Sequence, residues 1–262
     1  MSGCEGYTAI ARIYDKLNAD ISYKKWADFI ESCFDRYLRS RPELVLDLAC
    51  GTGSMTVEMA SRGYDMIGID GSEDMLSVAY ERSEGQGILY LCQDMRSFEL
   101  YGTVGAVLCC LDSLNYLLCE KDLKKTFSLV HNYLDPNGIF LFDMNTPYKF
   151  EHVYSDNAYI LEDEIVYEGE ENNPSAVFCG WQNQYDRESG ICDFYLSVFE
   201  EDENGRYIRS DEHQRERCYS LDSVKALLCE TGFEFVGAFA DYDFSSPDQK
   251  CERWYIAAIA KK

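Results

Sequence analysis

Apolar residues follow two different periods along the chain. Up to about residue 147, short apolar runs alternate with segments in which apolar residues recur every three or four positions. Such runs are typical of buried parallel strands, and the wider spacing is typical of the helices that cover them. The predicted strands span residues 44–48, 64–70, 88–92, 104–111 and 139–144, with helices at 7–17, 23–37 and after the first, second and fourth strands. This alternation predicts a doubly wound, mostly parallel α/β sheet.

From about residue 148 to 219 the period is mostly two, which predicts antiparallel strands. The expected strands, separated by two short polar turns, are 177–185, 192–199 and 206–218. We therefore expect a small antiparallel β insertion, residues 150–215, within a core formed by residues 1–149 and 216–262. The core resumes with a helix near 221–228 and strands at 233–239 and 254–260.

The charge of the chain limits its partners. Its 262 residues carry 47 Asp and Glu against 24 Lys and Arg, a net charge of −23. Nucleic-acid binding depends on neutralising phosphates with basic residues, so we expect no nucleic-acid partner. The charge is uneven, because residues 151–215 hold 17 acids against 4 arginines. That asymmetry marks the insertion as a separate structural unit.

No apolar run approaches the ~20 residues needed to cross a bilayer, and the N-terminus does not resemble a signal peptide. We expect a cytoplasmic protein with no membrane partner, either monomeric or homodimeric. None of the 12 cysteines forms a Cys-x-x-Cys pair, and most lie in apolar patterns. Reduced cysteines in such patterns behave as small hydrophobic residues. We therefore expect neither disulfides nor a metal site.

Residues 44–54 read Leu-Val-Leu-Asp-Leu-Ala-Cys-Gly-Thr-Gly-Ser and predict a strand, a glycine turn and the start of a helix. Glycines allow a sharp turn and a close approach of a ligand to the backbone. The dinucleotide fingerprint fits only in part, because Thr56 stands where its third glycine would be. Acidic residues end three successive predicted strands, at Asp47, Asp70 and Asp94. Their shared position at one sheet edge predicts a nucleotide-like ligand there.

Four stretches together resemble the class I S-adenosylmethionine (SAM) methyltransferases. They are Asp-Leu-Ala-Cys-Gly-Thr-Gly (47–53), Gly-Ile-Asp-Gly-Ser-Glu-Asp-Met-Leu (68–76), Gln-Asp-Met-Arg (93–96) and Asp-Ser-Leu-Asn-Tyr-Leu (112–117). The Ile-Tyr-Asp-Lys-Leu opening (13–17), with Tyr23 and Trp26, is similar to a bacterial subgroup of small cytoplasmic methyltransferases with a β-rich insertion. The resemblance implies a seven-stranded Rossmann-like sheet whose last strand is antiparallel, SAM as cofactor and a methyltransferase activity.

The resemblance also implies which residues contact the cofactor. Asp70 would hold the ribose, Asp94 the adenine amine, and Leu111 and Asp112 would lie near the sulfonium. The implied cofactor set is Trp26, Asp47, Ala49, Cys50, Gly51, Gly53, Asp70, Gly71, Met75, Asp94, Met95 and Leu111. Ala49 departs from the family, in which many members have glycine at this position.

Methyl transfer is an in-line displacement for which the protein supplies alignment, with a base only where the nucleophile carries a proton. We expect Tyr14 to face the methyl group, although its spacing also fits a core position. Asp112 and His213 complete the catalytic candidates. The strand around His213 is polar on both faces, so it is either a solvated edge or the wall of a pocket. In a pocket, His213 could act as the base, and Arg215 or Arg217 could pair with an acceptor carboxylate.

Three interpretations of function follow from these patterns. The first is a SAM-dependent methyltransferase that acts on a small molecule, with the insertion as a lid over the acceptor. The second is an NAD(P)-dependent oxidoreductase built on the same strand order. The third is a non-catalytic SAM-binding or scaffold protein. The insertion's position also permits a dimerisation arm.

Overall fold

A computed structural model of the chain describes residues 10–11, 13–161, 177–201 and 204–262. Its main sheet has seven strands in the order β10-β11-β5-β4-β1-β2-β3. They are β1 (Leu44–Leu48), β2 (Asp65–Asp70), β3 (Leu89–Cys92), β4 (Val104–Cys109), β5 (Leu134–Asn145), β10 (Phe233–Phe239) and β11 (Arg253–Ala260). β11 is antiparallel to both neighbours, and the other pairs are parallel. The predicted fold class is therefore confirmed.

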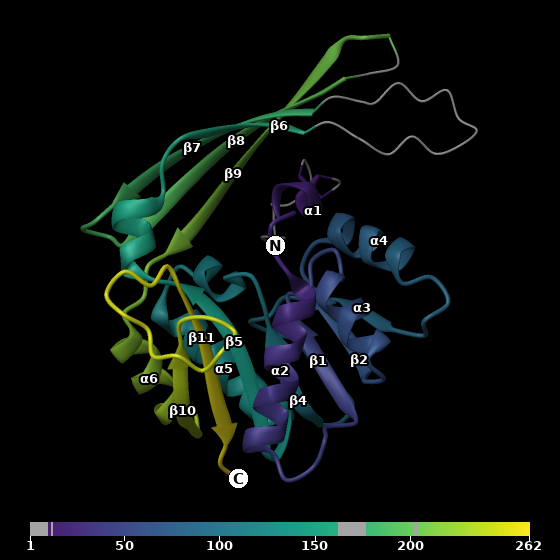
Figure 1. Cartoon of the computed structure of the whole chain (residues 1–262), viewed down its shortest axis with the longest axis vertical. Coiled ribbons are helices and arrows are strands. Elements are labelled where there is room, and N and C mark those ends of the chain that lie inside the picture. Colours follow the sequence, from purple (N-terminus) through teal and green to yellow (C-terminus); the bar gives the residue numbers. More distant parts are fainter. Residues whose placement is uncertain (1–9, 12, 162–176, 202–203) are drawn as a thin grey trace.

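Helices cover both faces of this sheet (Figure 1). They are α2 (Tyr23–Tyr37), α3 (Ser54–Ser61), α4 (Glu73–Arg82), α5 (Glu120–Tyr133) and α6 (Leu221–Glu230). Three of them start at a serine whose side chain accepts a backbone N–H of the first turn: Ser22, Ser72 and Ser220. Such capping supplies a partner to a backbone donor that the helix itself leaves unbonded.

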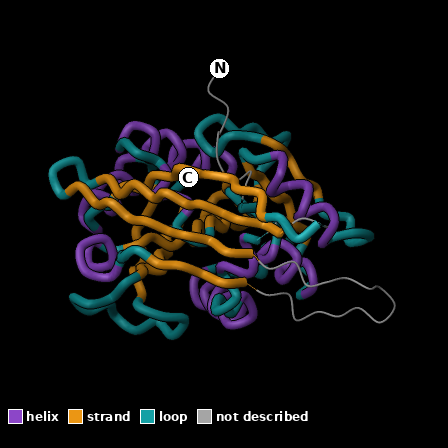
Figure 2. The backbone as a smooth tube through the Cα atoms, turned by 90° about the horizontal axis from the view of Figure 1, so that it is seen from above, coloured by secondary structure: helices purple, strands orange, loops and turns teal. Residues whose placement is uncertain are grey.

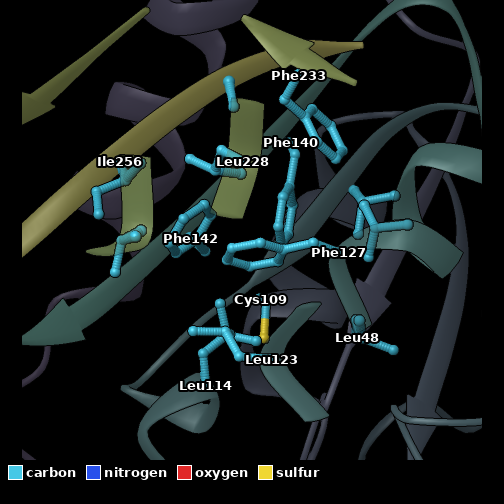
Figure 3. Close-up of a cluster of buried hydrophobic side chains, with 14 of the residues drawn as sticks. Leu48, Cys109, Leu114, Leu123, Phe127, Phe140, Phe142, Leu228, Phe233 and Ile256 are labelled. Carbon is cyan, nitrogen blue, oxygen red and sulfur yellow. The ribbon is translucent and has the colours of Figure 1, made fainter. Parts of the chain in front are cut away.

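The core is divided between the two faces of the sheet. On one face, Phe127 of α5 and Leu228 of α6 pack against Phe140 and Phe142 of β5 (Figure 3). The opposite face is covered by α2 and α3, whose apolar residues pack against alternate positions of β1, β4, β5 and β11. Since strand side chains alternate between faces, both sets of positions are buried, as expected of a central parallel sheet.

A second sheet has four antiparallel strands in the order β6-β7-β8-β9. The strands are β6 (Asn157–Leu161), β7 (Val177–Asp186), β8 (Ile191–Glu201) and β9 (Tyr207–Arg217). A short π-helical turn, η2 (Lys149–Val153), connects this sheet to the end of β5. Figures 1 and 2 show the second sheet lying across that end of the main sheet, above α1 (Tyr14–Leu17). Its inner face forms a separate apolar cluster with Ile10 and Ile13.

The structure differs from the predicted elements at the N-terminal helix, at the start of β5 and at β6. The expected helix at 7–17 is reduced to α1, and residues 7–9 and 12 of it lie outside the described residues. β5 begins at Leu134 and includes the predicted turn 135–138, where Asn137 takes a positive φ of 62° and the pairing with β4 shifts register. β6 was not among the predicted strands. Its short apolar stretch gives too little alternation to identify.

Among the described residues, no helix combines the length and apolar character needed to span a membrane. The cysteines of this part of the chain are unbridged, and six of them are buried. Within the same residues, no cluster of His, Cys, Asp and Glu has the arrangement of a metal site.

Candidate active site

The glycine turn follows the carboxyl end of β1. Gly51 and Gly53 have positive φ angles of 55° and 75°, a region that glycine enters without steric cost. A Cβ on Gly53 would lie 2.7 Å from the Tyr90 hydroxyl and 3.0 Å from the Ala79 Cβ, so this position must stay small. A Cβ on Gly51 would meet no atom within 4 Å. The backbone at Gly51 is thus open on the side where a ligand can approach.

Asp47 lies on β1 and is almost fully buried. Its Oδ2 accepts a hydrogen bond from Thr56 Oγ1 at 2.5 Å, whereas its Oδ1 has no partner among the described residues. Burial raises the pKa of this carboxyl to about 7, and the Thr56 hydrogen bond opposes the rise. A buried carboxylate oxygen without a partner is costly unless a donor arrives with a ligand. Thr56, which replaces the third fingerprint glycine, therefore has a role in fixing Asp47.

Asp70 ends β2 next to the glycine turn. Its two oxygens accept backbone N–H groups at 2.8 Å, from Gly51 and from Ser72. Burial raises the pKa of Asp70, and these hydrogen bonds oppose the rise. Ser72 in turn accepts the N–H of Met75, which places Gly71 and Met75 at the start of α4. Asp70 therefore joins the glycine turn to the loop that follows β2.

Asp94 and Met95 follow β3 in a short loop. Arg96 binds both carboxylate oxygens of Asp94, with Nε at 2.9 and 3.0 Å. Hydrogen bonds from Arg96 hold the pKa of Asp94 below its usual range. An adenine amine at this position would have to share the carboxylate with Arg96. Met95 is partly buried against the core.

A first cavity opens beside the glycine turn. It is lined by Asp47, Ala49, Cys50, Gly51, Thr52, Ser54, Met55, Cys110, Leu111, Tyr14 and Tyr23. The cavity has a volume of only about 20 Å³, and Tyr14 forms part of its wall. Asp15 fixes the segment that carries Tyr14 by accepting hydrogen bonds from Thr52 and Ser54 at 2.9 and 3.1 Å and by pairing with Arg82.

A second cavity of about 430 Å³ lies between the main sheet and the four-stranded sheet. Its walls come from distant parts of the chain: Ile10, Tyr14, Leu17, Asn18, Asp20, Leu111, Asp112, Tyr116, Lys149, Val153, Tyr154, Ser155, Asn157, Trp181, Asn183, Gln214, Glu216 and Arg253. Tyr14 and Leu111 line both cavities. These two side chains therefore belong to the wall of each cavity.

The backbone is strained where the cavities meet. Leu111 and Asp112 have positive φ angles of 57° and 50°, and Ala49 has one of 60°. Non-glycine residues seldom adopt this region, and strain of this kind gathers at functional sites. The strain at Leu111 and Asp112 explains why β4 stops at Cys109 and not at residue 111 as predicted. The strain at Ala49 explains why glycine suits this position in the family.

A cluster of charged side chains forms one end of the second cavity. Arg253 pairs with Asp112 at 2.6 Å and with the buried Asp143. Burial alone would raise the pKa of Asp112, but Arg253 and Lys149 outweigh it and hold that pKa below its usual range. Burial raises the pKa of Asp143 to about 6, with Arg253 opposing the rise.

Glu216 belongs to the same cluster. Its Oε2 accepts hydrogen bonds from Asn145 Nδ2 at 3.0 Å and from the Tyr154 hydroxyl at 3.4 Å. Asp112 is its neighbour in the cluster, and the two carboxyls shift each other's pKa. Burial, followed by repulsion from Asp112, raises the pKa of Glu216 to about 8. The two carboxyls therefore form an unequal pair, with the proton on Glu216.

The structure corrects His213 as a catalytic candidate: of the two interpretations of its strand, the solvated one holds for this side chain. His213 lies opposite Tyr195 on the outer face of the four-stranded sheet, stacks on that ring at 4.6 Å and contacts Asp193 Oδ1 at 2.7 Å. Because strand side chains alternate, the inner face of β9 carries Gln214 and Glu216 instead. The outer face of this strand is therefore solvated, as one interpretation expected, and its inner face lines the pocket, as the other expected.

Trp26 is the second predicted site residue that the structure places elsewhere. It is 3% exposed and packs edge-on against Tyr255 and at a tilt against Tyr242, inside the core beneath α2. It lines neither cavity. Its helical spacing with other apolar residues fits this core position.

Sequence reasoning missed Lys149, Tyr154, Gln214, Glu216 and Arg253. Lys149 and Tyr154 lie in the connection after β5, and Arg253 is the first residue of the last strand. The alternating pattern of the strands could have shown that Gln214 and Glu216 face inward. Their partners on β8 are Phe194 and Cys192, which are apolar.

Comparisons with known proteins agree with this geometry. The methyltransferase domain family matches residues 45–138. A Bacillus subtilis (strain 168) protein named "Putative methyltransferase YqeM" is 34% identical over 98% of this chain and 98% of its own length. The crystal structure of a SAM-dependent methyltransferase from Clostridium acetobutylicum ATCC 824 superposes with a TM-score of 0.81 at 32% identity, covering 97% of this chain and 98% of that one. Glycine/sarcosine N-methyltransferase from Halorhodospira halochloris is 27% identical over 87% of this chain and 78% of its own.

The chain belongs to the class I SAM-dependent methyltransferases. SAM is accordingly its cofactor, and the chain is an enzyme of this family instead of a nicotinamide-dependent oxidoreductase or a silent scaffold. The donor set fits that cofactor, because the glycine turn is open at Gly51 and Asp47 keeps a buried oxygen for a donor.

Proposed function

We propose that this enzyme transfers the methyl group of SAM to a small molecule held in the second cavity. The observation that carries the proposal is that Tyr14 and Leu111 line both cavities. A methyl group donated beside the glycine turn would pass between these two side chains. The second cavity is hereafter called the acceptor cavity, and the first the cofactor cavity.

The shape and charge of the protein support a small acceptor. A volume of about 430 Å³ lies within the range of small-molecule sites. The net charge of −23 opposes binding to nucleic acid. The glycine/sarcosine N-methyltransferase relative acts, by its name, on small molecules.

The proposed roles divide between the two cavities. Asp47, the glycine turn and Asp70 hold the cofactor, which supplies an electrophilic methyl group on a good leaving group. Tyr14 and Leu111 keep water from the point of transfer, and Asp112 fixes the acceptor beside them. Asp94, Met95, Gly71 and Met75 are assigned to the ribose and adenine end on the family resemblance alone.

The four-stranded sheet is proposed to act as a lid. It emerges from the carboxyl end of β5, and open α/β sheets bind ligands at that edge. Trp181, Gln214 and Glu216 bring its inner face into the wall of the acceptor cavity. A dimerisation arm is the alternative use of this sheet. A cytoplasmic location and a monomeric or homodimeric state stay predictions from the sequence.

The proposal is tested by incubating the protein with methyl-labelled SAM and a bacterial extract divided into fractions below and above 3 kDa. The label is expected in the low-mass fraction only. Label in protein or nucleic acid, with none in the low-mass fraction, contradicts a small acceptor. Asp70→Ala protein, which is expected to bind SAM poorly, is the control for transfer that depends on the cofactor cavity.

A further inference from the structure

The acceptor cavity has more ionisable carboxyl groups than cations, and a proton held by Glu216, whose pKa is raised to about 8, makes up the difference. Its charged end contains three carboxyl groups, from Asp112, Asp143 and Glu216, and two cations, from Lys149 and Arg253. Arg253 is held between Asp112 and Asp143, so its charge is already matched. The remaining cation, Lys149, would be the counterion of the third carboxyl group, Glu216. Its Nζ donates to Asn145 Oδ1, however.

The imbalance shows in the carboxyl pair of Asp112 and Glu216. Two neighbouring carboxyls, one with a lowered and one with a raised pKa, mark a position where an additional positive charge would be stabilised. Both residues line the cavity, and Asp112 directly follows Leu111, at the junction with the cofactor cavity. Asp20 adds a further carboxylate at the exposed rim. An anionic acceptor would increase the excess of negative charge, whereas a cation would reduce it.

Aromatic rings line the same cavity. Tyr14, Tyr116, Tyr154 and Trp181 contribute to its walls. The faces of such rings attract cations, and ammonium groups are often recognised by several rings together with carboxylates. Lys149 Nζ lies 5.3 Å from the centre of the Tyr154 ring, so this ring already faces an ammonium group and the other three rings are the ones that a ligand would contact.

We infer that the acceptor is a primary or secondary amine, bound as its ammonium between the aromatic walls and the Asp112–Glu216 carboxyl pair, and methylated on nitrogen. This inference rests on the proposed function and names the substrate class of that site. Glu216, as carboxylate, takes a proton from the ammonium. The nitrogen lone pair then forms a bond to the methyl carbon, the carbon–sulfur bond breaks, and its electron pair stays on sulfur. The proton on Glu216 leaves to water after S-adenosylhomocysteine and the methylated amine have formed.

The inference is tested by titrating protein loaded with S-adenosylhomocysteine with three probes of one length: n-butylammonium chloride, n-butanol and sodium butyrate. We expect n-butylammonium to bind at least about tenfold more tightly than either of the others. Binding of n-butylammonium that is no tighter than that of n-butanol, or no binding at all, overturns the inference. Tighter binding of butyrate overturns it as well.

Two variants assign this selectivity to the carboxyl pair. Glu216→Gln keeps the size of the side chain and is expected to weaken n-butylammonium at least about tenfold, while S-adenosylhomocysteine binds within about twofold of wild type. Asp211→Asn removes a carboxylate from the outer face of the same strand, where Asp211 is 58% exposed, and is expected to change neither affinity. Equal losses in the two variants would mean that the net charge, and not the pair, selects the cation.

The pH dependence of n-butylammonium binding is a separate test of the role of Glu216. The pKa of Glu216 is raised to about 8, so its carboxylate, and with it n-butylammonium affinity, is expected to increase about tenfold from pH 7 to 9. The groups that face Glu216 from neighbouring elements, and that titrate or carry charge, are Asp112, Asp143, Lys149, Tyr154, Cys192 and Arg253. An increase that persists in Glu216→Gln would belong to one of these groups and would contradict the role of Glu216.

The class of product separates this inference from the proposed function. In the labelled extract experiment, a low-mass product that is stable to alkali and retained on a cation exchanger supports methylation of an amine. A low-mass product that is an alkali-labile ester or an uncharged ether overturns the amine while the proposed function stands. Label found only in macromolecules overturns both.

Discussion

The cofactor cavity and the acceptor cavity are built in opposite ways, although they share Tyr14 and Leu111. The cofactor cavity takes most of its wall from one continuous stretch, residues 47–55. The acceptor cavity takes its wall from at least five separate segments, which lie far apart in the sequence. A common cofactor can thus be recognised by a local motif, whereas the acceptor is recognised by a set that only the fold assembles.

The difference extends to the lid. If the acceptor is held by segments that the lid brings together, then removing the lid should affect only one of the two cavities. Replacing residues 158–211 by a short Gly/Ser linker removes Trp181 and Asn183 from the acceptor cavity and leaves the cofactor cavity's lining intact. We expect methyl transfer to decrease more than about 100-fold, the cost of losing alignment and exclusion of water.

SAM affinity of the lid-deleted protein, measured by calorimetry, is expected to stay within about fivefold of wild type, and this serves as the control for folding. A truncated protein that keeps its turnover would contradict the lid. Loss of a dimer with full activity would assign the sheet to dimerisation.

On the cofactor side, the largest single effect is expected from Asp70. Asp70→Ala removes the carboxylate that accepts the Gly51 and Ser72 N–H groups and that is assigned to the ribose. We expect SAM to bind about 1.5–3 kcal/mol more weakly, the usual value for hydrogen bonds to a charged group. Asp65→Ala, at the exposed opposite end of the same strand, is the matched control. Unchanged calorimetric affinity in Asp70→Ala would show that the ribose assignment is wrong.

Tyr14 belongs to both cavities, so its replacement should affect transfer more than binding. Burial raises the pKa of Tyr14 well above its usual value, so its hydroxyl stays protonated and the ring is what shapes the junction. We expect Tyr14→Ala to lower kcat about 10- to 100-fold through misalignment. Tyr14→Phe keeps the ring and is expected to stay within about threefold of wild type. A reversed order of the two variants, in single-turnover assays, would mean that the hydroxyl carries the function.

The smallest expected effect is a change in thermal stability when Glu216 is replaced. The pKa of Glu216 rises from its ordinary 4.5 to about 8 on folding because of burial and repulsion from Asp112. Between these two values the unfolded chain releases a proton that the folded chain keeps, so the free energy of unfolding falls as pH rises. Glu216→Gln should therefore raise the midpoint of thermal unfolding at pH 8 by about 2–4 °C, the shift that roughly 1 kcal/mol produces in a chain near this size.

At pH 4, where both states hold the proton, this gain from Glu216→Gln should vanish. Asp211→Asn provides the comparison with an exposed carboxylate of the same strand. If Glu216→Gln is less stable than wild type at pH 8, then Glu216 stabilises the folded protein at this pH and does not destabilise it.

Most of the main sheet could be predicted because its strands are buried on both faces and its helices carry regular apolar stripes. The cofactor residues could be predicted for a related reason. Asp47, Gly51 and Asp70 depend on strand ends that lie within 25 residues of each other in the chain, and the sheet brings such ends together at one edge.

The acceptor residues could not be predicted in the same way. Glu216 and His213 lie three positions apart on one polar strand, and only its pairing with β8 decides which of them faces inward. Arg253 belongs to the site because it pairs with Asp112 and Asp143, which lie more than 100 positions earlier in the sequence. No local pattern records these contacts, because they depend on strand order and on the position of the lid.

The central claim is that the methyl group is delivered between Tyr14 and Leu111, where the two cavities meet. The most direct measurement is an isotope-filtered nuclear Overhauser experiment on protein bound to SAM that carries a ¹³C methyl group. The account predicts cross-peaks from that methyl to the Tyr14 ring and to the Leu111 methyls, assigned with Tyr14→Phe and Leu111→Val proteins. Bound SAM whose methyl group shows no cross-peak to either residue would contradict it.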